Sequence, residues 1–314
     1  MDATARLRTL SALLTVTAAG CAADGGDEVG GGMNPPVESI SDGTTDQLTA
    51  KVEVAFKGGP GALGLAATEV ADGWTVTYTK FLVAVGTFEF SRPGATEVEY
   101  EQLAVIDLLA ANAEVVLGEA AIYSGVSELS FTLPPASSRF QPVAPATDDD
   151  RDLMADGGYA LYVEGTIGRE DGLTCIGQDP PLCTPAPTIA FAWGITGGAK
   201  ITDCPPVVVD DDDVVDRVLE LPGDRWFRTN FNVAGAAPPI RRAQWIADAD
   251  ANRDGETTLD ELAKLPASVA FPAKLGFDVR TGAPLKVTTA RDYVLGQALL
   301  LGRDALGCGS VTAL

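Results

Sequence analysis

One twelve-residue segment carries oxygen-bearing side chains at a spacing that suits a hard metal ion. Residues 250–261 read Asp-Ala-Asn-Arg-Asp-Gly-Glu-Thr-Thr-Leu-Asp-Glu. Side-chain oxygens occupy positions 1, 3, 5 and 12 of this segment, namely Asp250, Asn252, Asp254 and Glu261. Glycine at position 6 permits a sharp turn, and the backbone carbonyl of Glu256 at position 7 supplies a further oxygen. Because Ca²⁺ prefers a ring of oxygen ligands, the segment predicts a calcium-binding loop.

Two predicted helices flank this loop. Residues 240–247 follow a pair of prolines and carry apolar side chains at positions that suit a short amphipathic helix. After the loop, Leu259, Leu262 and Leu265 share one helical face, and a proline follows directly. Helix, loop and helix in this order resemble the EF-hand family over residues 240–266, and the resemblance implies calcium binding.

The loop is expected to act alone. Position 8 of an EF-hand loop is usually apolar and pairs with a second loop. Here it is Thr257, and the sequence contains no second loop of this pattern. A solitary loop is more typical of a structural calcium clip than of a sensor, and extracellular modules bind calcium at roughly 10⁻⁴–10⁻³ M. The alternative interpretation is an acidic turn that caps a helix without a metal ion.

The N-terminal residues have the pattern of an export signal. Arg6 and Arg8 precede an apolar run over residues 10–18, and small residues lead to Cys21. This order of charged, apolar and small residues predicts a secretory signal peptide over residues 1–20. Cys21 directly follows Ala-Ala-Gly, which resembles a bacterial lipobox. The resemblance implies that Cys21 becomes the lipid-modified N-terminus; the alternative is an ordinary signal peptide with an incidental cysteine.

A flexible tether is expected after the signal. Residues 21–48 are rich in glycine and acidic side chains and poor in large apolar ones, so they cannot form a core. No later stretch reaches the ~20 apolar residues that a membrane-spanning helix needs. The expected location is the cell outer membrane, with a lipid anchor and with the protein either periplasmic or surface-exposed.

The charge and composition exclude several kinds of function. The net charge is −22, which argues against nucleic acid as a partner, because phosphates need Lys and Arg. The chain has no histidine, so it cannot form Ser-His or Cys-His catalytic arrangements. No G-x-S-x-G motif is present. We therefore expect a non-enzymatic protein; the alternative is a hydrolase that uses paired carboxylates, such as a glycosidase.

The cysteines after residue 21 predict disulfides. They are Cys175, Cys183, Cys204 and Cys308, an even number in an exported chain. Four cysteines allow three pairings. We favour Cys175 with Cys183 across a short loop, which leaves Cys204 with Cys308. A zinc site is the rival interpretation, but the spacing contains no C-x-x-C pair.

The middle of the chain predicts an antiparallel β-sandwich over residues 49–213. Short runs that alternate apolar and polar residues are separated by glycine and proline, which is typical of sandwiches and barrels. The expected strands are Ala50–Phe56, Trp74–Tyr78, Phe81–Val85, Phe88–Phe90, Leu103–Leu108, Ile122–Thr132, Tyr159–Ile167 and Thr188–Trp193. Their aromatic residues are expected in the core or in cross-strand pairs.

After residue 213 the pattern becomes helical. Residues 214–314 are expected to form an α-rich segment that contains the calcium loop, with a further helix over Thr289–Leu306. Two acidic runs, Asp148–Asp152 and Asp210–Asp213, are interpreted as solvated loops; a second metal site is the alternative.

Residues 50–200 resemble the secreted β-sandwich lipoproteins of the copper-binding MbnP-like kind. The resemblance rests on Gly73–Gly86 and on the Tyr-Ser-Gly-Val run that begins at Tyr123. It implies a sandwich fold, but without histidine no copper ligand carries over. The sequence therefore predicts a lipid-anchored, calcium-binding protein of the cell envelope, with a structural role or a protein or glycan partner.

Overall fold

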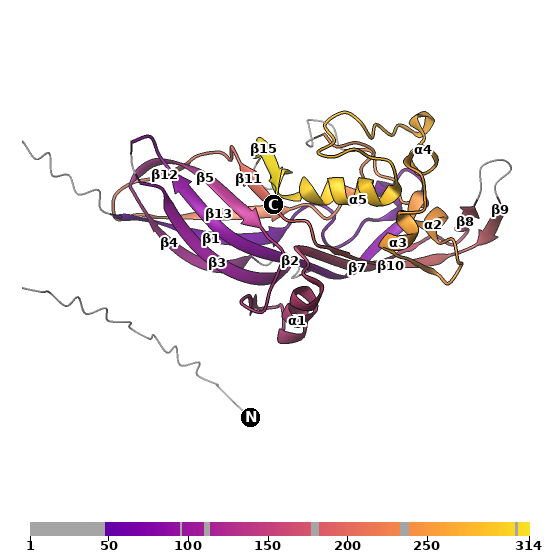
Figure 1. Ribbon diagram of the computed structural model, residues 1–314, viewed down its shortest axis with the longest axis horizontal. Helices are drawn as coiled ribbons and strands as arrows, with labels where there is room; N and C mark the ends of the chain where they lie inside the picture. Colours follow the sequence, from indigo (N-terminus) through magenta and orange to yellow (C-terminus); the bar gives the residue numbers. More distant parts are fainter. Residues whose placement is uncertain (1–47, 95, 110–113, 177–181, 233–238, 305–306) are drawn as a thin grey trace, which may run out of the picture. The chain divides into compact units, whose positions relative to one another are not determined.

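The computed structural model describes residues 48–314 apart from 95, 110–113, 177–181, 233–238 and 305–306 (Figure 1). Thr45–Leu314 form one compact unit. The expected signal peptide over residues 1–20, the lipidation site Cys21 and the tether up to residue 47 lie outside the described residues. Among the residues described, no helix has both the length and the apolar character needed to cross a membrane.

The chain is mainly β, as predicted. Alternating apolar and polar residues explain many of the strands, because a strand that packs one face onto a core buries every second side chain. In β10, for example, burial alternates from Thr188 to Ile195. The strands are β1 (Ala50–Gly58), β2 (Thr75–Ser91), β3 (Val98–Asp107), β4 (Val115–Ile122), β5 (Gly125–Leu133), β6 (Gln141–Val143), β7 (Leu161–Gly168), β8 (Leu173–Ile176), β9 (Leu182–Pro185), β10 (Thr188–Ile195), β11 (Ala199–Thr202), β12 (Val207–Val209), β13 (Val214–Leu221), β14 (Glu256–Thr257) and β15 (Ser310–Ala313).

A large sheet forms the centre of the structure. Its strands run in the order β14-β10-β7-β2-β5-β11-β15, with β3 paired to β2, β6 to β3 and β12 to β5. The longest strand is β2, where the sequence predicted three shorter ones. Irregularities in register at Tyr78–Lys80 and Val85–Thr87 shift the apolar spacing by one residue each time. One face of β2 therefore reaches the same core along its whole length, whereas Leu82 and Ala84 on the other face pack into a second, smaller cluster with Met154 of α1.

A smaller sheet, in the order β13-β1-β4, packs against the large one. The ring of Phe56 on β1 lies 6.2 Å from that of Phe88 and 6.0 Å from that of Phe131, both of which belong to the large sheet. β13 begins directly after the expected domain boundary at residue 213 and pairs in parallel with β1. The strand beyond residue 213 thus completes the sheet before it, and both lie in the same compact unit.

Helices lie on both faces of the large sheet, most of them toward the end that carries β10 (Figure 1). They are α1 (Asp148–Gly157), α2 (Gln244–Ala249), α3 (Leu259–Leu262), α4 (Ala267–Ala270) and α5 (Ala290–Leu299), with short 3₁₀ turns η1 (Ala67–Glu69), η2 (Arg225–Phe227), η3 (Ala273–Leu275) and η4 (Leu301–Asp304). The helices α2, α3 and α5 lie where the sequence predicted helices. Trp245 of α2 stacks on Trp193 of β10 with ring centroids 6.0 Å apart, so this helical segment shares the main core.

The first acidic run is helical, where a solvated loop was expected. Asp148–Asp152 opens α1, and the hydroxyl of Thr147 caps the helix by accepting from the backbone N–H of Asp150 at 3.3 Å. Acidic side chains in a first turn are stabilised by the helix dipole, which explains the outcome. Asp150 is also buried and pairs with Lys80 of β2. The second run, Asp210–Asp213, lies between β12 and β13, outside regular structure as expected.

Two disulfides confirm the favoured cysteine pairing. Cys175 and Cys183 are opposite each other on β8 and β9. Cys204 and Cys308 join the residues after β11 to the residues before β15. The second bond links the C-terminal strand to the large sheet, beside the ladder of β11 with β15.

Candidate functional site

The helix that leads into the predicted calcium loop is held at its start by Asp72. The carboxylate of Asp72 accepts from the backbone N–H groups of Ala243 and Gln244, each at 3.0 Å. These donors are among the N–H groups that a helix leaves without internal partners at its first turn. A residue far away in sequence thus fixes the direction in which α2 enters the loop.

The first half of the loop is folded around its own polar side chains. Asp250, which is 2% exposed, accepts from the backbone N–H of Asp254 at 3.2 Å and of Gly255 at 3.1 Å. Asn252 accepts from the same Asp254 N–H at 2.9 Å, and Asp254 accepts from the N–H of Glu256 at 3.0 Å. Gly255 has φ +85°, the left-handed conformation for which position 6 needs glycine. The side chains predicted at positions 1, 3 and 5 therefore all face inward onto the loop.

The second half places Glu261 at the start of α3. One oxygen, Oε2, accepts from the backbone N–H of Thr258 at 3.0 Å and from its hydroxyl at 3.1 Å, which completes a capping box. The other oxygen, Oε1, is buried and has no hydrogen-bond partner, and the residue is only 6% exposed. A buried carboxylate oxygen without a donor is unfavourable, so this atom fits a further ligand.

The loop is joined to the large sheet where a second EF-hand loop would pair. Glu256 and Thr257 form β14, which runs parallel to Ala190 and Phe191 of β10. The Thr257 hydroxyl donates to the carbonyl of Ile246 at 2.8 Å, and its carbonyl accepts from the indole N–H of Trp193 at 2.9 Å. The fully buried threonine at position 8 is thus satisfied within the fold.

The structure does not gather the predicted ligands into a metal centre. Within the described residues, no three side chains of the His, Cys, Asp or Glu types lie close enough together to hold a metal ion. Asp250, Asp254 and Glu261 therefore do not form a three-carboxylate group, and Glu261 is turned to its capping role. Glu256, expected to act through its carbonyl, has an exposed side chain. Calcium binding by this loop remains a prediction. The side chains at its first three ligand positions already point into the loop.

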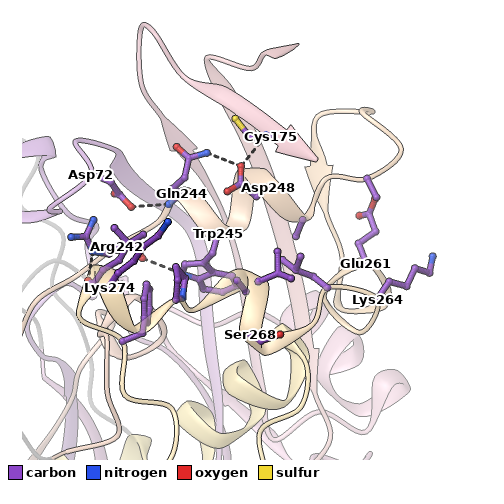
Figure 2. Close-up of a pocket in the computed structure, with 18 residues that line it drawn as sticks. Asp72, Cys175, Arg242, Gln244, Trp245, Asp248, Glu261, Lys264, Ser268 and Lys274 are labelled. Carbon is purple, nitrogen blue, oxygen red and sulfur yellow. Dashed lines mark hydrogen bonds between the residues drawn. The ribbon is translucent and has the colours of Figure 1, made fainter. Parts of the chain in front are cut away.

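A groove of about 690 Å³ lies beside α2 and α3 (Figure 2). Sequence reasoning did not find it, because its walls come from four separate stretches of the chain. Apolar side chains that line it include Trp245, Leu265, Val269, Pro272 and Phe277. Charged side chains that line it are Asp72, Arg242, Asp248, Glu261, Lys264 and Lys274. The groove thus touches the predicted loop through Glu261.

The carboxylate of Asp248, which also lines this groove, is held by two hydrogen bonds. Its Oδ1 accepts from the backbone N–H of Cys175 at 2.9 Å and from the Gln244 amide at 2.8 Å. Burial raises the pKa of the Asp248 carboxyl, and the charge of Asp72 raises it further, while the two hydrogen bonds oppose these effects. The bond from Cys175 also fixes the disulfide-linked hairpin of β8 and β9 against α2.

A buried cluster of arginine and aspartate joins η2, the residues before α2 and the end of η4. We call the following residues the arginine–aspartate cluster: Asp224, Arg225, Arg228, Arg241 and Asp304. Asp224 accepts from Arg228 and Arg241, and Asp304 accepts from Arg225 and Arg228. Burial lowers the pKa of Arg225 to about 10, against the raising effect of Asp304, so its guanidinium stays charged at neutral pH.

This cluster is also hydrogen-bonded to the aromatic core. The hydroxyl of Tyr293 on α5 donates to the carbonyl of Arg228. The hydroxyl of Tyr78 on β2 donates to the carbonyl of Gly223 at 2.5 Å and accepts from the indole of Trp226 at 2.6 Å. Sequence reasoning missed the cluster, since only the spacing of Asp224 and Arg228 hints at an ion pair. Its role is to position the helices, and through them the loop and the groove.

Comparison with protein-family models, curated proteins and solved structures finds no match to this chain.

Proposed function

We propose that this protein is a non-enzymatic, calcium-binding protein of the cell envelope, anchored to the outer membrane by a lipid on Cys21. In this proposal two facing sheets form a β-sandwich, and residues 240–266 act as an EF-hand-type segment attached to it. Calcium would be held by Asp250, Asn252 and Asp254, by the carbonyl of Glu256 and by Glu261. The metal would act as a structural clip that supplies positive charge among these oxygens.

The buried, unpartnered Oε1 of Glu261 is the observation that carries the proposal. It is the last ligand position of a loop whose first three ligand side chains already face inward. Calcium binding would exchange the capping bonds of Oε2 for metal ligation and would give Oε1 a partner. A turn that only caps a helix does not require Asn252 to point into the loop. It also does not require a buried carboxylate oxygen that lacks a hydrogen-bond donor.

The attachment of the loop to β10 favours a structural role over a sensor. Sensor loops expose a surface when they bind calcium, whereas β14 is hydrogen-bonded to the edge of the large sheet. The carboxylates of Asp72 and Asp248 act as acceptors for backbone or amide donors, which supports a binding role for the groove. An unidentified protein or glycan is the expected partner.

Calorimetric titration of calcium into the purified full chain tests the metal site. We expect binding to raise the free energy of unfolding by ~1.4 kcal/mol at ten times Kd. Such a gain raises the Tm by about 3–6 °C for a domain of this size. Glu261→Gln should weaken binding, because it removes a charge and a carboxylate oxygen. Glu256→Gln is the matched control, since only the backbone of Glu256 is a proposed ligand.

Equal calcium affinities in wild type and Glu261→Gln would contradict the proposal. Magnesium should substitute poorly, because it demands six tight ligands and retains its waters. The anchor has a separate test. Cys21→Ser should move the protein from the membrane fraction to the soluble exported fraction, and continued membrane association would show that the anchor lies elsewhere.

A further inference from the structure

Charges of both signs face the groove without an ion-pair partner inside the protein. Among the salt bridges of the residues described, none involves Asp72, Asp248, Lys264 or Lys274. The two carboxylates are partly buried, whereas both lysines are exposed at the rim. Partly buried carboxylates and exposed lysines therefore line the same groove.

The recessed carboxylate of Asp248 is held in place. Its Oδ1 is fixed by two donors, the Cys175 N–H and the Gln244 amide. A carboxylate whose position is set in advance loses little freedom when a ligand ammonium binds, which favours recognition. The wall also holds the buried Oε1 of Glu261, an acceptor that lacks a donor.

The floor between these charges is apolar. Trp245 forms part of it and is packed edge-on against Phe271, with ring centroids 5.4 Å apart, so the indole is rigid. Val269 and Phe277 continue the apolar surface. A volume of about 690 Å³ lies within the roughly 300–1,000 Å³ range of small-molecule sites. A rigid apolar floor with a few polar groups is the usual design of such a site.

We propose that this groove binds short apolar peptides with free termini, with the ammonium group against Asp248 and the terminal carboxylate against the lysines at the rim. The inference extends the binding role in the proposed function and does not require calcium. A purely cationic ligand would leave Lys264 and Lys274 unused, and a purely anionic one would meet the recessed carboxylates. A peptide with both charges and an apolar body matches all three features.

The test is calorimetric titration of the full chain with the tripeptide Leu-Leu-Leu in three forms. These are the free peptide, the N-acetylated peptide and the C-terminally amidated peptide. We expect acetylation to weaken binding by about tenfold or more, because it removes a charge-assisted hydrogen bond. Amidation should weaken binding less, since Lys264 and Lys274 are exposed to solvent.

Asp248→Asn should abolish the difference between the free and the acetylated peptide. Asparagine keeps an oxygen to accept from the Cys175 N–H and the Gln244 amide, so the local structure is retained, and the Tm checks this. The matched control is Asp260→Asn, which removes an exposed charge on α3 outside the groove. Ser268→Trp should fill the groove and block all three peptides, because Ser268 is an exposed lining residue.

Three results would overturn the inference. They are no saturable binding of the free peptide up to about 10 mM, an unchanged acetylation effect in Asp248→Asn, and unchanged binding in Ser268→Trp. Each titration is repeated with calcium and with chelator. Peptide binding without any calcium response would refute the calcium site alone, whereas a calcium response without peptide binding would refute the groove alone.

Discussion

Replacement of Asp224 with asparagine should destabilise the folded chain by about 3 kcal/mol. Asp224 is fully buried and accepts from Arg228 at 3.1 and 2.8 Å and from Arg241 at 2.7 and 2.6 Å. Loss of one partner from a buried ion pair costs about 3–5 kcal/mol, because a charge remains without compensation. Two features set the value at the lower end. Arg228 keeps Asp304, and the side chain of Arg241 is 14% exposed, so water reaches it.

Urea denaturation of the full chain measures this change as a shift in midpoint at constant slope. The Tm should fall by about 6–12 °C, at roughly 2–4 °C for each kcal/mol. Asp152→Asn is the control, since its side chain is 61% exposed and should change stability by less than about 0.5 kcal/mol. A loss below about 1 kcal/mol for Asp224→Asn, as for a surface pair, would refute the reasoning that the arginine–aspartate cluster holds η2, the residues before α2 and η4 together.

Three further predictions concern an ion pair, the disulfides and a buried hydroxyl. Burial raises the pKa of Asp150, but hydrogen bonds from Lys80 and Thr147 outweigh it and the net pKa is lowered. This contribution to stability is present above the unfolded pKa of about 3.9 and is lost as pH falls through the folded pKa. The destabilisation caused by Lys80→Met should therefore shrink between pH 7 and pH 3 in urea titrations; a constant difference would contradict this. Alkylation without reductant should label none of the four paired cysteines, and Cys204→Ser should lower the free energy of unfolding by about 2–5 kcal/mol. Thr257→Val removes a buried hydroxyl that donates to α2 and should cost about 1–3 kcal/mol by thermal or urea unfolding; an unchanged midpoint would show that the hydroxyl adds no stability.

The β class and several strands could be predicted from the sequence, because a strand with one buried face alternates apolar and polar side chains. The sequence divided β2 into three strands because Lys80 and Gly86 interrupt the alternation. In the fold these positions lie at irregularities in register, so the strand continues through them. The acidic run that opens α1 was misinterpreted because charge density was weighed above Thr147, whose position before three aspartates is a capping signal.

In the candidate site, too, the features formed within one segment could be predicted, and those formed by distant residues could not. The loop over residues 250–261 could be proposed from the sequence because all of its predicted oxygen ligands lie within one short segment. The groove could not, because Asp72, Cys175 and Lys274 are brought together only by the packed fold. The same holds for the arginine–aspartate cluster, whose members Asp224 and Asp304 are separated by most of the helical segment.

The short ladder between β14 and β10 has a consequence for self-association. β10 is next to the end of the large sheet, and β14 covers its outer side at Ala190 and Phe191. An uncovered strand presents unpaired N–H and C=O groups, which can template pairing with another chain. A chain whose loop had lost its order would expose this edge of β10, the strand that carries Phe191 and Trp193. The twelve-residue loop therefore covers this edge at Ala190 and Phe191, and a loss of order in the loop would remove that cover.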